Sequence, residues 1–273
     1  MAEVGKQIRI RRLLGDDGKL VSVLFDHAIA RGVLPGIRSI EDKLQAVLKG
    51  TPDAVTVQRG IADHVYVRHV RPEVSLVLKA TSPNPYDKTY AAVLADVEDA
   101  VERGADAIAI GCVIGGSHQA EGMEQASALI REAEQFGLPV IGHFYPNGEN
   151  IPVPERETWE NVAYAARVGA EIGVDILKIH HSGNVEELIR IAEAVPARVV
   201  LAGGSHGKEI RDYLEMAHNT VLAGMDGIAF GRTVWNYPDP TALVQALNGI
   251  VHKGWNVEEA MEFLPSHPGE STI

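Results

Sequence analysis

The sequence predicts a single α/β domain in which eight parallel strands close into a (β/α)8 barrel, preceded by an extra N-terminal helix. Three observations predict this fold: eight short apolar runs, amphipathic stretches between them, and a length of 273 residues. The runs are continuously apolar, which is typical of parallel strands that are buried on both faces. Eight strand–helix units over about 250 residues match the size of a TIM barrel.

The eight predicted strands are short and rich in Val, Ile and Ala. They cover residues 20–25, 54–58, 74–79, 107–111, 140–144, 175–180, 198–202 and 227–230. An open, doubly wound sheet is the alternative, but its dinucleotide-binding members carry a Gly-x-Gly-x-x-Gly turn after the first strand. Here Asp26, His27 and Ala28 follow that strand, so the barrel is favoured.

The segments between the strands carry helix signals. One of them has an apolar stripe at helical spacing, formed by Trp159, Val162, Ala163 and Ala166. Asn184 precedes an acidic first turn, as an N-cap residue does. Helices are also expected at 4–14, before the first strand, and at 257–263. The predicted organisation is an N-terminal helix and turn (1–19), a catalytic barrel (20–253) and a C-terminal tail (254–273).

Composition narrows the class of protein. The formal net charge is −12 and the pI is about 5.4, which argues against nucleic acid and anionic membranes as partners. The single cysteine, Cys112, permits no disulfide within the chain and is expected to be a packing residue. No apolar run approaches the roughly 20 residues that span a bilayer. The sequence therefore predicts a cytoplasmic protein.

Lys178 is the most informative residue, because it lies inside an apolar, β-branched run. Strand alternation places it on the same face as Ile176 and His180, which is expected to point into the barrel mouth. The carboxyl ends of the strands are where such barrels hold their chemistry. A buried lysine loses hydration, so its pKa falls and its neutral amine can form a Schiff base with a carbonyl substrate.

Two further side chains complete a catalytic set at the same end of the barrel. Tyr145, after the fifth strand, is expected to shuttle a proton, because a nearby cation would lower its pKa towards neutrality. Asp26, after the first strand, is expected to bind or deprotonate a substrate hydroxyl, or to pair with Lys178. The structural alternatives are a helix cap for Asp26 and a rim aromatic for Tyr145.

Glycines after the last two strands predict a phosphate site. Gly203, Gly204 and Ser205 follow strand seven, and Gly231 and Arg232 follow strand eight. Glycine lets backbone N–H groups approach an oxyanion, and these two loops form the usual phosphate site of such barrels. The alternative is that the glycines only form tight turns.

Four histidines are expected near the same mouth: His181, and the three that belong to the predicted site, His27, His143 and His180. Together they could bind zinc and support a metal-dependent aldolase or hydrolase. Against that alternative, no His-x-His pair follows the first strand and no acidic residue ends the eighth. We therefore expect the three site histidines to line the substrate site, with no metal or cofactor other than the covalent imine on Lys178.

The order of these motifs resembles the archaeal-type class I fructose-bisphosphate aldolases and their relatives, an aldolase-like heptulosonate synthase and a thiolase acting on phosphorylated autoinducer-2 products. The resemblance covers about residues 20–253 and is carried by five segments, 24–27, 144–148, 175–178, 202–204 and 230–235. It implies a Schiff-base role for Lys178, acid–base roles for Tyr145 and Asp26, and phosphate binding by the two glycine loops with Arg232. It also implies no metal and a homo-oligomer, often built from pentameric rings.

Departures from that pattern concern the substrate. His143 stands where these aldolases usually carry Trp, and Asn147 stands where Arg usually follows Tyr-Pro. The chemistry is expected to be retained and the substrate to differ, without a guaranteed second phosphate. The leading hypothesis is a Schiff-base lyase acting on a phosphorylated ketose-type substrate. The alternatives are a sibling transferase that uses the same lysine, a metal-dependent hydrolase, and a non-catalytic phosphosugar-binding barrel in which Lys178 only pairs with Asp26.

Overall fold

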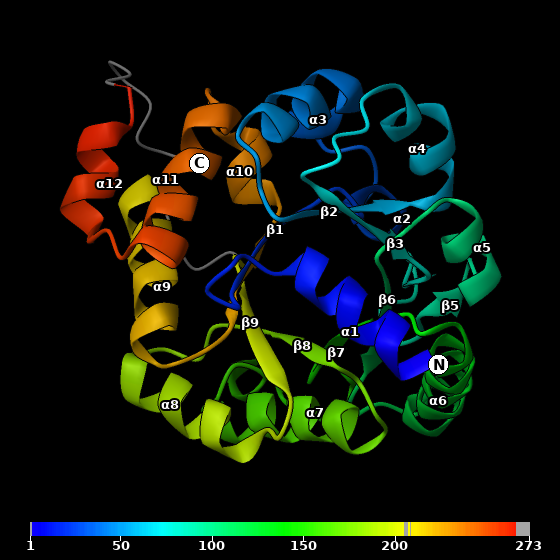
Figure 1. The fold of residues 1–273 in the computed structure, drawn as a ribbon. Helices are drawn as coiled ribbons and strands as arrows, with labels where there is room; N and C mark the ends of the chain where they lie inside the picture. The colour runs from blue at the N-terminus through cyan, green and yellow to red at the C-terminus, as the bar shows by residue number, and fades with distance from the viewer. Residues whose placement is uncertain (1, 205–206, 208, 266–273) are drawn as a thin grey trace.

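Eight parallel strands close into a barrel in the computed structural model of this chain, which describes residues 2–204, 207 and 209–265 (Figure 1). Around the barrel the order is β1, β10, β9, β8, β7, β6, β3 and β2, and every neighbouring pair is parallel. Their bounds are β1 Leu20–Leu24, β2 Ala54–Gln58, β3 Ser75–Lys79, β6 Ala107–Val113, β7 Val140–Tyr145, β8 Ile176–Ile179, β9 Arg198–Ala202 and β10 Gly227–Phe230. The predicted fold class is confirmed, and each predicted strand agrees with an observed one to within two residues at either end.

Helices surround the barrel and follow the strands in turn (Figure 1). The α-helices are α1 Ala2–Leu13, α2 His27–Arg31, α3 Ile40–Lys49, α4 Arg59–His64, α5 Val97–Glu102, α6 Gln119–Phe136, α7 Trp159–Glu171, α8 Val185–Ala194, α9 Ile210–Leu222, α10 Arg232–Asn236, α11 Pro240–Lys253 and α12 Val257–Phe263. Short 3-10 turns are η1 Pro35–Ile37, η2 Tyr66–Arg68 and η3 Val153–Glu155. The predicted N-cap of α8 is confirmed, because the Asn184 side chain accepts a hydrogen bond from the Glu187 N–H at 3.0 Å. No helix in the described part of the chain is long and apolar enough to cross a membrane.

The apolar core has two layers, separated by the strands. Along β8, Leu177 and Ile179 face the large outer cluster between strands and helices, whereas Ile176 faces a smaller cluster inside the barrel. Strand alternation therefore places Lys178 on the interior face, as the sequence predicted. The interior cluster is built from one or two residues of each strand, so it is narrow and closely packed.

Helix α1 closes the amino-terminal end of the barrel (Figure 1). Leu13 and Leu14, at and just past its end, belong to the interior cluster and are buried. Lys6 of the same helix pairs with Asp175, which precedes β8, at 2.7 Å. Because the base is filled in this way, the carboxyl ends of the strands form the open end of the barrel.

A histidine also joins the last barrel helix to the base. His252 on α11 lies 3.0 Å from the carboxylate of Asp17 and 3.0 Å from that of Asp53. Asp53 also accepts a hydrogen bond from the Val21 N–H of β1 at 2.6 Å. Burial alone would lower the pKa of His252, but the hydrogen bonds and charges of the two carboxylates raise it above its ordinary value.

The sequence did not predict a small antiparallel hairpin after β3. It consists of β4 Thr81–Ser82 and β5 Ala92–Val93. The Thr81 hydroxyl accepts a hydrogen bond from the Gly111 N–H of β6 at 2.6 Å. The hairpin therefore begins at the mouth of the barrel, beside two strand ends.

Candidate active site

Polar side chains occupy the last interior positions of several strands. Lys79 ends β3, His143 lies near the end of β7, and Lys178 lies on β8 as the register partner of His143. Asp26 follows β1 and stands at the N-cap position of α2, but its side chain makes no capping hydrogen bond. The carboxylate is free of that structural role and belongs to the mouth.

Asp26 is the acidic centre of this group. Its two carboxylate oxygens lie 3.4 Å from His27 Nδ1 and 3.8 Å from His143 Nδ1. Burial alone would raise the pKa of Asp26, but the charges of His27, Lys178 and Lys79 lower it below the ordinary value. Asp26 is therefore an ionised carboxylate at neutral pH, although its side chain is only 11% exposed.

Lys178 has the electrostatics that imine formation requires. Burial lowers its pKa to about 8, and the charges of Arg232 and Arg31 act in the same direction, against Asp26, which raises it. The structure thus agrees with the prediction that the pKa of Lys178 is lowered.

Lys79 is a second buried amine that the sequence reading missed. Only 5% of the residue is exposed, and burial lowers its pKa to about 7, with Asp26 opposing the shift and Lys178 adding to it. The available signal was a lysine at the end of the apolar run 74–79, in the same kind of position as Lys178.

Tyr145 joins the site, but one expectation about it is wrong. Its ring stacks on His180 with centroids 4.1 Å apart and lies 6.2 Å from the ring of His143. Burial raises the pKa of the phenol and Asp26 raises it further, against a smaller lowering by Arg31. Among the described residues no cation brings the Tyr145 pKa towards neutrality, so the residue is a protonated phenol at neutral pH.

The two histidines beside Asp26 are neutral. Burial lowers the pKa of His27 to about 4, and burial with the charges of Lys79 and Lys178 lowers that of His143 well below its ordinary value. His143 Nε2 is buried and has no hydrogen-bond partner in the described part of the chain. It is thus available to a polar group of a ligand. Among the described residues no three His, Cys, Asp or Glu side chains are arranged to hold a metal ion.

The predicted phosphate loops lie beside this group. Arg232 donates a hydrogen bond from Nη2 to the Gly204 carbonyl at 2.9 Å, which joins the loop after β10 to the loop after β9. A Cβ atom on Gly231 would lie 2.5 Å from His27 Cε1, so only glycine fits there. A Cβ atom on Gly203 would lie 3.1 Å from Phe230 Cδ1, so Gly203 packs closely against that ring. Ser205, the other predicted member, lies outside the described residues.

Arg31, at the end of α2, was also missed. Its charge lowers the pKa of Lys178 and of Arg232, so this exposed guanidinium lies close enough to act on both groups. For Arg232, burial is the larger cause of the lowered pKa and the charge of Arg31 comes second. Two guanidinium groups that repel each other beside glycine loops are suited to an anion.

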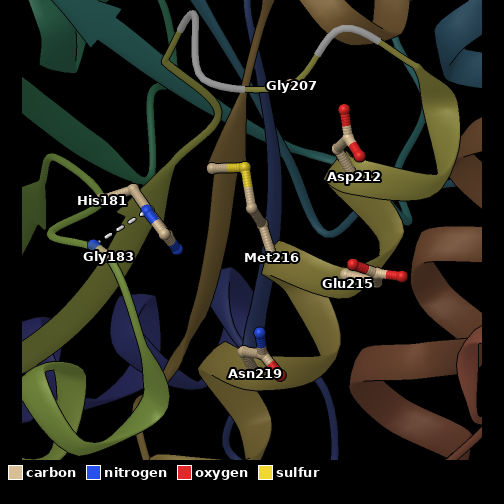
Figure 2. Close-up of a pocket in the computed structure, with 7 residues that line it drawn as sticks. All are labelled: His181, Gly183, Gly207, Asp212, Glu215, Met216 and Asn219. Carbon is tan, nitrogen blue, oxygen red and sulfur yellow. Dashed lines mark hydrogen bonds between the residues drawn. The ribbon is translucent and has the colours of Figure 1, made fainter.

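Two residues near the carboxyl ends of β2 and β6 do not join the site. Arg59 is exposed and binds the Asp99 carboxylate at 3.2 Å. Cys112 is buried, and burial raises the pKa of its thiol to about 11, so it is the packing residue that the sequence predicted. A separate hollow lies between the loop after β8 and helix α9 (Figure 2). Its walls include Asp212 and Glu215 but none of the catalytic candidates, and their negative charge disfavours a phosphate.

Comparison with known proteins identifies the family of this chain. Residues 20–237 match the family model described as DeoC/LacD family aldolase. The chain belongs to the DeoC/LacD aldolase family. It is an enzyme of the aldolase type, as the sequence predicted.

Heptulosonate synthases and fructose-bisphosphate aldolases are among the relatives of this aldolase. The chain is 33% identical over 269 residues to 2-amino-3,7-dideoxy-D-threo-hept-6-ulosonate synthase 1 of Archaeoglobus fulgidus, covering 95% of this chain and 96% of the relative. It is 29% identical to the class 1 fructose-bisphosphate aldolase of Halobacterium salinarum, covering 90% and 95%. A solved archaeal fructose-1,6-bisphosphate aldolase, with its catalytic lysine covalently bound to the carbinolamine intermediate of the substrate, superposes with a TM-score of 0.82 at 27% identity, covering 90% of this chain and 99% of that one. The expected resemblance to this group is confirmed.

Proposed function

We propose that this aldolase works by class I chemistry, in which Lys178 forms an imine with a phosphorylated ketose-type substrate before a C–C bond is cleaved or formed. The observation that carries the proposal is the burial of Lys178 at the barrel mouth. With a pKa of about 8, about one amine in ten is neutral at pH 7, whereas about one in 3,000 would be neutral at the ordinary value of 10.5. Only the neutral amine can attack a carbonyl.

The neighbours of Lys178 are suited to the proton transfers of cleavage. The amine adds to the carbonyl carbon, water leaves, and the iminium withdraws electrons from the adjacent C–C bond. Asp26, which is ionised, accepts the proton of the substrate hydroxyl as that bond breaks. Tyr145, which is protonated, donates its proton to the resulting enamine carbon. Return of a proton from Asp26 to Tyr145 restores both groups.

The phosphate of the substrate is proposed to bind at the loops after β9 and β10. Gly203, Gly204 and Gly231 carry no side chain that would cover the backbone there, and Arg232 supplies the positive charge. His27, His143 and His180 would contact the uncharged part of the substrate. A site that holds a carbonyl group at Lys178 and a phosphate at these loops fits a small phosphorylated carbonyl compound. Neither nucleic acid nor a membrane is proposed as a partner.

A second candidate is a sibling transferase that uses the same lysine. Relatives named 2-amino-3,7-dideoxy-D-threo-hept-6-ulosonate synthase, in Archaeoglobus fulgidus and Halobacterium salinarum, support it at 33% and 30% identity. The two candidates share imine formation and differ in the acceptor. Release of a free aldehyde from fructose 1,6-bisphosphate would favour the lyase, and turnover only with an added acceptor would favour the transferase.

Borohydride trapping tests the shared chemistry. Dihydroxyacetone phosphate and related phosphorylated ketoses are reduced on the enzyme, and the adduct is located by peptide mass spectrometry. We expect labelling of Lys178 in the natural protein and none in Lys178→Met, whose side chain keeps the volume without the amine. Lys49→Met, at an exposed lysine, is the matched control and should label normally. Absence of an adduct with every ketose would contradict the proposal.

The assembly remains a prediction. Homo-oligomers, including pentamer-based rings, are expected from the resemblance, and light scattering after size exclusion would measure the number of subunits.

A further inference from the structure

One row of side chains at the barrel mouth contains a gap. Gly111, His143 and Lys178 are register partners on β6, β7 and β8, so they lie side by side at one height. Gly111 has no side chain, and a Cβ atom placed there would lie 3.4 Å from Lys79 Nζ and 3.4 Å from the His143 carbonyl oxygen.

Lys79 fills this gap from the next strand. It is the register partner of Ala109, one interior position below Gly111 on β6. Its side chain therefore extends upward, so that the amine comes level with the row that holds Lys178. Gly111 presents no side chain beside this amine, and even a Cβ atom there would only touch it.

We infer that Lys79 is a second catalytic amine, the acid that protonates the departing hydroxyl of the carbinolamine on Lys178 and the base that recovers this proton on hydrolysis. The inference rests on the proposed imine at Lys178. It assigns to Lys79 a step that Asp26 and Tyr145 do not perform in the cleavage scheme.

The step balances in atoms and charge. In the forward direction the carbinolamine C–O bond breaks, the hydroxyl leaves with a proton from the Lys79 ammonium as water, and the nitrogen lone pair of Lys178 forms the C=N⁺ bond. The single positive charge passes from Lys79 to the iminium. On hydrolysis water adds to the iminium carbon, the neutral Lys79 amine takes the proton of that water, and the charge returns.

The surroundings of Lys79 suit an exchangeable proton rather than a fixed ion pair. The charged and titratable groups that face it are Asp26, Lys178 and His143. In the described part of the chain no carboxylate lies within 4.0 Å of its amine. A structural lysine at this burial would be expected to have such a partner. A pKa of about 7 keeps both protonation states populated at neutral pH, which is the condition for acid–base catalysis.

The pH profile of imine formation tests the assignment. Timed borohydride quenching with dihydroxyacetone phosphate gives the rate at which the Lys178 adduct accumulates. Because Lys178 must be neutral and Lys79 protonated, the natural protein should show a bell-shaped profile with apparent inflections near 7 and 8. In Lys79→Met the rate at the optimum should fall about 10²–10⁴-fold and the alkaline decline should disappear, while the final amount of adduct stays the same.

Two further variants separate acid catalysis from packing. Lys79→Gln keeps a polar side chain without a transferable proton and should behave like Lys79→Met. Gly111→Ala adds a methyl group in ordinary van der Waals contact with the amine, which keeps its place and its proton, and should slow adduct formation less than either substitution of Lys79.

Each outcome bears on one claim. If Lys178 is labelled and Lys79→Met forms the adduct at the natural rate, the role of Lys79 is wrong and the proposed function stands. If the natural protein forms no adduct, the proposed function itself fails. Labelling of Lys79 in place of Lys178 would also overturn the assignment. Should the variants not fold, as judged by circular dichroism, the natural profile decides, because a rate without an alkaline decline excludes an acid of this pKa.

Discussion

Replacing Asp26 by Asn should move imine formation to lower pH. The negative charge of Asp26 raises the pKa of Lys178 and of Lys79 against the burial that lowers both. Asparagine has nearly the same shape but no charge, so burial would act on the two amines unopposed. Both pKa values should fall, and a neutral Lys178 should persist into acidic solution.

The size of the shift follows from the geometry. An opposite charge at about 4–6 Å changes a pKa by about 1–3 units, and because neither amine has a carboxylate within 4.0 Å among the described residues, we take about one unit. The apparent inflections should move from near 7 and 8 to near 6 and 7. At pH 6 the rate relative to each protein's own optimum should then rise from about one sixth to about four fifths.

The assay is timed borohydride quenching with dihydroxyacetone phosphate between pH 5 and 9. Each rate is divided by the rate of the same protein at its optimal pH, so that weaker substrate binding by the variant does not affect the comparison. When both amines are required, the normalised acidic limb depends on both pKa values; if Lys79 takes no part, it depends on Lys178 alone, and in either case it should move to lower pH. Asp106→Asn, at the start of β6 and therefore at the opposite end of the barrel, is the matched control and should leave the profile unchanged. An acidic limb that stays in place or moves upward in Asp26→Asn would refute the reasoning.

Two other predictions concern the phosphate loops and the base of the barrel. Arg232→Ala should raise the KM for a phosphorylated ketose about 10–100-fold, the cost of one hydrogen bond to a charged group, and should change little for the dephosphorylated analogue; equal effects in steady-state assays would remove the phosphate role. His252→Gln should destabilise the fold by about 1–3 kcal/mol at pH 6, through loss of its ion pairs with Asp17 and Asp53. Because the folded pKa of His252 is raised, this contribution is complete below its unfolded pKa and is lost as the pH rises through the folded value. Thermal melting should therefore separate the variant from the natural protein more at pH 6 than at pH 9, and the reverse order would contradict the sign.

The barrel could be predicted from the sequence because each strand is buried on both faces. Runs such as 198–202 and 227–230 are apolar at every position except Arg198, so their limits were recovered without knowledge of their neighbours. The hairpin of β4 and β5 could not be recovered, because each of its strands has two residues and depends on pairing with a distant segment. Short strands leave no periodic signal.

The site could be predicted where a polar residue interrupts such a run. Lys178 is flanked by apolar residues on both sides, so its burial follows from the sequence. Lys79 ends its run, and a lysine there can equally turn outward. The groups around its amine, such as Asp26 and Lys178, become its neighbours only in the closed barrel. Arg31 lies on a short helix whose path after β1 has no sequence signature. The predicted lowering of the Tyr145 pKa was wrong because burial of the phenol raises its pKa and the charge of Asp26 raises it further, and neither follows from the local sequence.

The filled base of the barrel has a consequence for engineering. Leu13 and Leu14 plug the end opposite the catalytic row, and His252 ties α11 to that same end. Substitutions at separated sites usually have additive effects on stability. Residues of the base can thus be changed to raise thermal stability while residues of the mouth are varied for a new substrate. The two sets of substitutions can then be combined without further substitutions to compensate for interactions between them.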